Sequence, residues 1–177
     1  MPSITRAQAL RTTGAVALFA PWLSAAAGAA VRADAGDVKL LETAVAFERA
    51  AIKAYSDGAA SGVLSPPVAA VTTQFTSDHT AHLAALVSAL QAAGQQPGEQ
   101  VTAMVPPTFQ TEMDVLNYAY TIERGAATMY LDAIAQIKDR TLAKTLASIL
   151  GVDTAHVALL AEALSKYPAY PTGFITA

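Results

Sequence analysis

Apolar residues recur every three or four positions along four long stretches of the chain, a spacing that places them on one face of an α-helix. The stretches cover about residues 37–57, 66–93, 111–139 and 141–165. Glycine and proline gather between them, alanine and leucine dominate within them, and β-branched residues form no long runs. The pattern therefore predicts an all-α protein with four helices.

Residues at the edges of these stretches are typical of helix ends. We expect Gly58 to end the first helix, and Ser65 to cap the second with Pro66 at its first position, where a missing N–H costs nothing. Gly94 offers the left-handed conformation that ends a helix. Thr111 begins a capping-box pattern before the third helix. These residues predict where the connections between the helices begin and end.

The lengths of the connections predict how the helices are arranged. Two short connections, residues 59–64 and 139–141, favour antiparallel helix pairs. The connection at residues 94–110 can extend over about 50 Å, whereas a 25-residue helix is ~38 Å long. It can therefore cross the whole bundle. We predict an antiparallel four-helix bundle with a long crossover between the second and third helices.

Residues 1–35 have the pattern of an export signal. Arg6 and Arg11 precede an apolar stretch at residues 14–23, and the small-x-small patterns at 27–29 and 33–35 offer cleavage sites. This predicts an exported protein, placed in the periplasm, in the cell envelope or outside the cell. The folded domain would then cover residues 36–166, followed by an irregular tail at 167–177. An uncleaved membrane anchor is the alternative, and a membrane partner is expected only in that case.

Charge and cysteine content exclude several classes of function. The formal net charge is −3 and no block of lysine or arginine occurs, so we expect no nucleic-acid partner. The chain has no cysteine, which excludes disulfides, thiolate metal sites and iron–sulfur clusters. Any metal must therefore be bound by histidine, aspartate, glutamate or water.

The second helix pair repeats the first. Phe-Glu-Arg-Ala-Ala at residues 47–51 returns as Ile-Glu-Arg-Gly-Ala at 122–126, and Tyr55 returns as Tyr130, both 75 positions later. His-Thr-Ala-His at residues 79–82 returns as Asp-Thr-Ala-His at 153–156, 74 positions later. Such consistent spacing indicates two equivalent helical hairpins.

Side chains that can bind a metal lie near the middle of each helix. They are Glu48, the pair His79 and His82, Glu123, and the pair Asp153 and His156. Mid-helix positions of an antiparallel bundle share one level, and residues three apart share a helical face, so all six can point into the core. Buried carboxylates and imidazoles are costly unless they are paired or coordinated. Either they bind a metal, or Glu48 and Glu123 pair with His82 and His156 in a metal-free core.

The order Glu, His-x-x-His, Glu, Asp-x-x-His resembles the ferritin-like superfamily, and most of all exported bacterial ferritin-like proteins related to desiccation-related and rubrerythrin-like proteins. In that superfamily two glutamates and two Glu-x-x-His pairs bind two iron or manganese ions. The resemblance implies one or two ions of iron, manganese or zinc per chain. It makes Glu48 and Glu123 terminal ligands, and it puts His79 and Asp153 at the bridging positions in place of glutamates. Asp78, beside His79, is another source of a bridging carboxylate.

Three functions follow from this resemblance as hypotheses. The first is an oxidoreductase of ferroxidase or peroxidase type, in which the metal meets O2 or peroxide. The second is a non-enzymatic envelope protein of stress or desiccation, with a structural metal or none. The third is iron storage in a shell. The sequence leaves a homodimer open.

Overall fold

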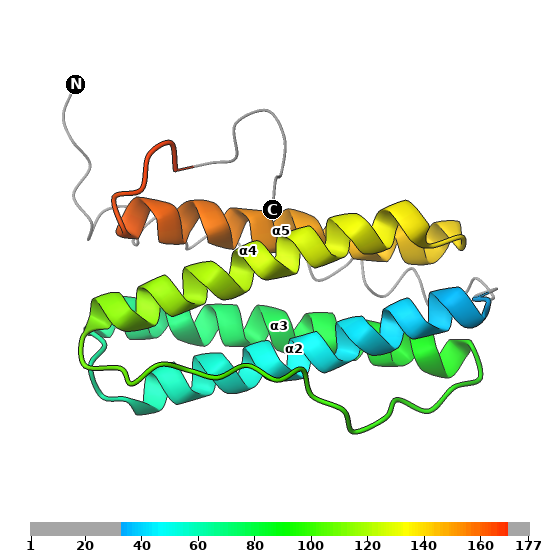
Figure 1. Ribbon diagram of the computed structural model, residues 1–177, viewed down its shortest axis with the longest axis horizontal. Helices are drawn as coiled ribbons and strands as arrows, with labels where there is room; N and C mark the ends of the chain where they lie inside the picture. The colour runs from blue at the N-terminus through cyan, green and yellow to red at the C-terminus, as the bar shows by residue number, and fades with distance from the viewer. Residues whose placement is uncertain (1–32, 170–177) are drawn as a thin grey trace.

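The computed structural model describes residues 33–169, which form an elongated bundle of four α-helices (Figure 1). They are α2 (Ala35–Ala60), α3 (Pro66–Ala92), α4 (Glu112–Gln136) and α5 (Arg140–Ala163). The predicted all-α four-helix bundle is confirmed. The export-signal pattern at residues 1–32 and the end of the tail, residues 170–177, lie outside the described residues.

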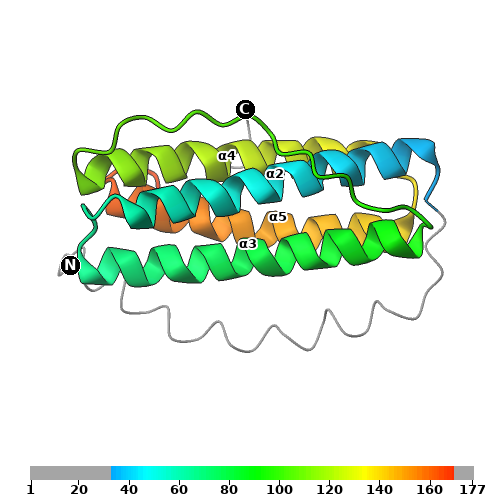
Figure 2. The same ribbon diagram turned by 90° about the horizontal axis from the view of Figure 1, so that it is seen from below.

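Helices α2 and α3 form one hairpin, α4 and α5 form the second, and the hairpins pack with α2 against α4 and α3 against α5. The predicted crossover runs lengthwise along the bundle beside α2 (Figure 2). The N–H of Thr102 donates to the carbonyl of Ala46 at 3.0 Å. Arg49 Nη1 donates to the carbonyl oxygens of Gly98 and, at 3.2 Å, Gln100. One arginine beside a candidate ligand thus holds the crossover on α2.

Most helix ends lie where the capping residues predict them. Ser65 is the N-cap of α3, and Thr111 and Asp114 form the capping box of α4. Gly94 follows α3 with φ of +77°, as its left-handed role requires.

Gly58 does not end α2, and that prediction was wrong. The helix continues to Ala60, and the left-handed glycine is Gly62, with φ of +74°. A Cβ atom added to Gly58 would lie only 2.9 Å from Val115 Cγ1 on α4. The absence of a side chain at Gly58 lets α2 and α4 approach closely.

The first turn of α2 includes residues that the sequence pattern assigned to the export segment. The Asp34 carboxylate accepts hydrogen bonds from the N–H groups of Gly36 and Asp37, at 2.8 and 3.0 Å. Its other oxygen lies 2.6 Å from Lys138 Nζ at the end of the other hairpin. Asp34 therefore caps the folded helix and belongs to the bundle.

A carboxylate in the first turn of α2 binds the connection between α4 and α5, and one in the first turn of α4 binds the connection between α2 and α3. The buried Asp37 carboxylate accepts from the N–H groups of Lys138 and Asp139, at 2.8 and 3.0 Å. Glu112, 75 positions after Asp37, accepts from the N–H of Ser65 at 2.6 Å. The repeat in the sequence is thus a repeat in structure, and each half fastens the other.

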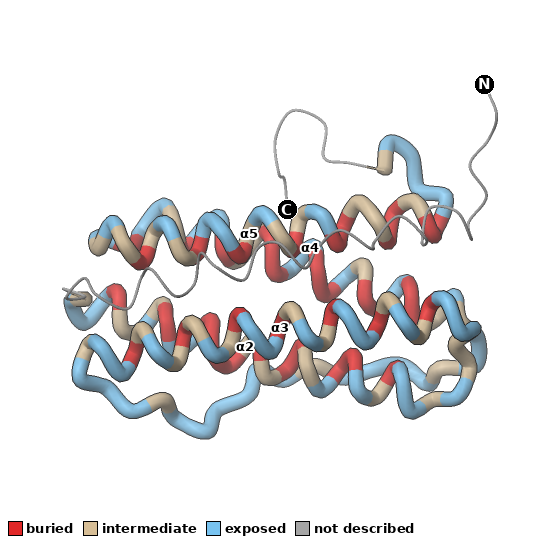
Figure 3. The backbone as a smooth tube through the Cα atoms, turned by 180° about the vertical axis from the view of Figure 1, so that it is seen from behind, coloured by how far each residue is buried: buried red, intermediate tan, exposed pale blue. Residues whose placement is uncertain are grey.

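Buried residues recur along all four helices (Figure 3). Apolar side chains form clusters towards both ends of the bundle interior. One cluster is centred on Leu41, Leu86 and Leu146, and a second on Tyr55, Phe75 and Leu160. Among the described helices, α5 is long and apolar enough to cross a membrane by length and composition alone. It supplies core residues to both clusters, and a core helix passes the same test. The two clusters leave one polar layer between them.

Candidate metal centre

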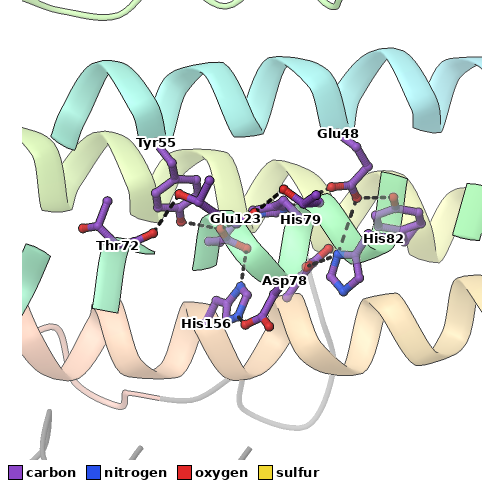
Figure 4. A network of polar contacts seen from close by, with 12 residues as sticks. Glu48, Tyr55, Thr72, Asp78, His79, His82, Glu123 and His156 are labelled. Carbon is purple, nitrogen blue, oxygen red and sulfur yellow. Dashed lines mark hydrogen bonds and ion pairs between the residues drawn. The ribbon is translucent and has the colours of Figure 1, made fainter. Parts of the chain in front are cut away.

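All six predicted side chains meet in this layer, one set from each helix. Figure 4 labels all of them except Asp153. Every one of them is buried, and Glu48, His79, Glu123 and Asp153 have 0% exposure. Their donor atoms form two overlapping groups, within each of which the atoms lie within 4.8 Å of one another. The first group is Glu48, His79 and His82; the second is His79, Glu123, Asp153 and His156.

His79 lies between the two glutamates. Its Nδ1 is 2.7 Å from Glu48 Oε2, and its Nε2 is 2.9 Å from Glu123 Oε1. Burial lowers the pKa of His79, but its hydrogen bonds to Glu123 and Glu48 outweigh that effect and raise it well above the usual range. Burial raises the pKa of Glu48, yet the histidines hold it at about 2. In the metal-free protein one imidazolium thus pairs with two carboxylates and offsets one of their two negative charges.

His82 plays a smaller part in these ion pairs than the metal-free hypothesis expects. Its Nδ1 is 3.7 Å from Glu48 Oε1 and 3.6 Å from Asp153 Oδ1, and makes no hydrogen bond. Glu48 therefore pairs chiefly with His79, since that contact is 1 Å shorter.

His156 is fixed on both sides of its ring. Nδ1 is 3.3 Å from Glu123 Oε2, Nε2 is 3.1 Å from Asp78 Oδ2, and the ring stacks on Phe75 with centroids 3.7 Å apart. Burial lowers the pKa of His156, but Asp78 and Glu123 raise it to about 9. Asp78 also accepts from Gln74 Nε2. It lies behind His156, so the structure does not place Asp78 at the bridging position.

Asp153 is a fully buried carboxyl group without a hydrogen bond. Neither of its oxygens has a hydrogen-bond partner among the described residues, and its contact with His82 Nδ1 is 3.6 Å long. Burial, and then repulsion from Glu123 and Glu48, raise its pKa well above the usual range. An unsatisfied buried group costs about 1–3 kcal/mol. Such a group requires an explanation, and a bound cation supplies one.

The spacing of the donor atoms fits a metal ion. Two atoms that each lie about 2.1 Å from a tetrahedral metal are about 3.4 Å apart. The closest contacts between carboxylate and imidazole donors here range from 2.7 to 3.7 Å. A set of ligands that contains only oxygen and nitrogen donor atoms, with three carboxylates among them, suits iron, manganese or zinc. The residues present therefore fit the metals that the resemblance implies.

Two tyrosines hold the glutamates from the opposite hairpins. The Tyr55 hydroxyl donates to Glu123 Oε1, and the Tyr130 hydroxyl donates to Glu48 Oε1. Burial, followed by the neighbouring carboxylates, raises both tyrosine pKa values well above 10, so the hydroxyls keep their protons. Their positions seven residues after the glutamates suggest a shared helical face, but which carboxylate each one contacts depends on how the hairpins dock.

Comparison with known proteins finds a matching family model and similar folds. A family model described as a ferritin-like domain matches residues 36–166. The fold is similar to that of a conserved hypothetical protein from Mycobacterium tuberculosis, with a TM-score of 0.67, 18% identity and coverage of 78% of this chain and 96% of that chain. It is also similar to a ferritin-like, diiron-carboxylate protein from Bacillus anthracis str. Ames, with a TM-score of 0.63, 20% identity and coverage of 72% and 94%. The sequence matches none of the curated proteins.

Proposed function

Because the chain belongs to the ferritin-like domain family, we propose that it is a metal-binding oxidoreductase that oxidises Fe(II) or reacts with O2 or peroxide. The proposed ligands are the six buried side chains of the polar layer: Glu48, His79, His82, Glu123, Asp153 and His156. The observation that carries the proposal is Asp153, because its buried carboxyl group has no hydrogen-bond partner among the described residues.

Several residues of the layer have a definable task. Glu48, Glu123 and Asp153 provide negative charge that favours a higher metal oxidation state. Asp78 fixes the ring of His156 through Nε2 and leaves Nδ1 directed at the carboxylates. Bound iron or manganese would supply the one-electron chemistry. The apolar clusters on both sides keep bulk water from the layer.

A non-enzymatic bundle is the second candidate, and the ion pairs of His79 favour it. His79 and His156 satisfy both glutamates without any metal. A protein of this kind would be stabilised by the ion pairs, or by a metal that undergoes no chemistry. The two candidates differ in what happens when metal and an oxidant are supplied.

The test is metal analysis followed by kinetics. Protein purified without chelator and reconstituted anaerobically with Fe(II) should contain one or two ions per chain, and exposure to O2 or peroxide should oxidise them faster than free Fe(II). Asp153→Ala should abolish both, whereas Asp132→Asn, on the exposed surface of α4, should change neither. Stoichiometric binding without accelerated oxidation supports the second candidate. No metal in the reconstituted protein refutes the metal site.

The proposed location is outside the cytoplasm, supported by the signal pattern of residues 1–35. Because Asp34 caps α2, cleavage after Ala29 leaves the helix intact, whereas cleavage after Ala35 removes its cap. We therefore expect the mature chain to begin at residue 30. Mass spectrometry of the protein recovered from cell fractions tests both points, and uncleaved protein in the cytoplasm contradicts them.

A further inference from the structure

His79 belongs to both groups of donor atoms, and its two ring nitrogens face different groups. We propose that His79 bridges two metal ions, one on each ring nitrogen, so that the centre is joined by an imidazolate and not by a carboxylate. This inference rests on the proposed function, since it requires that the layer binds metal.

The two donor sets lie on opposite sides of the His79 ring. On the Nδ1 side are Glu48, 2.7 Å away, and His82, whose Nδ1 lies 3.7 Å from Glu48. On the Nε2 side, Glu123 lies 2.9 Å away and is itself 3.3 Å from His156 Nδ1. His79 is the one residue common to both sets among the described residues.

Three of the four nearby carboxylates, those of Glu48, Glu123 and Asp78, are poorly placed to bridge in place of the ring. Glu48 and Glu123 lie on opposite nitrogens of His79, each held by a tyrosine hydroxyl. Asp78 is turned towards the outer nitrogen of His156. Asp153 alone remains as a carboxylate within reach of both sides, 3.6 Å from His82 and grouped with Glu123.

An imidazolate bridge sets a characteristic spacing. With bonds of 2.0–2.1 Å from each nitrogen, the two ions lie about 6 Å apart, against about 3.5–4 Å in carboxylate-bridged two-metal sites. Each N–H proton of the ring leaves to solvent as a metal takes its place, so the ring ends as an anion between two cations. The Nε2 side offers four donor residues and the Nδ1 side three, so the Nε2 side should fill first.

Crystals of the full chain soaked in zinc, with anomalous data collected at the zinc edge, test the proposal. Two peaks about 6 Å apart, on either side of the His79 ring, are expected. Two peaks about 4 Å apart or closer, or a single peak, would overturn the bridge while leaving the metal site in place. No zinc peak in the layer would remove the proposed function as well.

Copper(II) provides a second readout in solution. Two Cu(II) ions joined by an imidazolate are exchange-coupled, so the low-temperature EPR spin count should fall below the copper content. His79→Gln should restore the full spin count. His82→Gln removes a ligand but keeps the bridge, so two coppers bound to this variant should remain coupled. A full spin count in wild type loaded with two Cu(II) ions per chain would contradict the bridge even if the variants fail to fold.

Discussion

Replacing Asp153 with asparagine should stabilise the metal-free protein and remove its metal. The substitution keeps the shape of the side chain but removes a buried acid that has no hydrogen bond and lies among the carboxylates of Glu48 and Glu123. The new amide can donate hydrogen bonds to those carboxylates. A residue retained at a cost to stability is expected where it serves a function.

The size of the effect follows from the burial of Asp153. Relief of an unsatisfied buried group is worth about 1–3 kcal/mol in unfolding free energy. For a domain of this size, that should raise Tm by about 3–10 °C. Since the pKa of Asp153 is raised in the folded state, the acid destabilises the fold only above its unfolded pKa of about 3.8. The part of the asparagine advantage that depends on pH should therefore be present at pH 7 and disappear near pH 3.8, whereas the part due to the missing hydrogen bond should remain.

Calorimetric unfolding of chelator-treated protein across this pH range measures the stability, and zinc titration measures the affinity. Asp132→Asn, an exposed site on α4, should change the unfolding free energy by no more than about 0.5 kcal/mol. A lower Tm for metal-free Asp153→Asn at pH 7, together with wild-type zinc binding, would refute the interpretation of Asp153 as a ligand.

Three further predictions concern the surrounding structure. Tyr55→Phe and Tyr130→Phe should each lower the unfolding free energy by about 1.5–3 kcal/mol in urea titrations, because each hydroxyl donates to a buried carboxylate. Metal-free protein should lose stability as pH rises from about 6.5 to about 9, because the folded pKa of His156 is raised to about 9; His156→Gln should flatten that part of a Tm–pH curve. A chain that begins at residue 36 should have a lower Tm than one that begins at residue 30, because it lacks the Asp34 cap.

Helix ends could be predicted from the sequence where the signal is local. Thr111 and Gly94 act through their own backbone and near neighbours, so short patterns identify them. Gly58 misled the prediction because its role depends on Val115, a residue of another helix. A glycine that permits close packing and one that ends a helix look alike in a single sequence.

That the six candidate ligands meet in one layer could also be predicted from the sequence. Their mid-helix level follows from helix and connection lengths, and the repeat identifies them twice. Their partners could not be predicted, because the choice between His79 and His82 for Glu48 rests on a difference of 1 Å. The contact of Asp78 with His156 likewise depends on how α3 and α5 face each other.

The exchange of tyrosines between hairpins has a consequence for assembly. Glu48 on the first hairpin is held by Tyr130 of the second, and Glu123 by Tyr55 of the first, so neither hairpin alone presents a finished ligand set. An ion that needs both halves binds the native chain and not the unfolded one. By mass action, a metal at 100 times its dissociation constant would add about 2.7 kcal/mol to the stability of the whole bundle. Metal supply would then govern the fraction of chains in which the two hairpins are docked, as well as what they do.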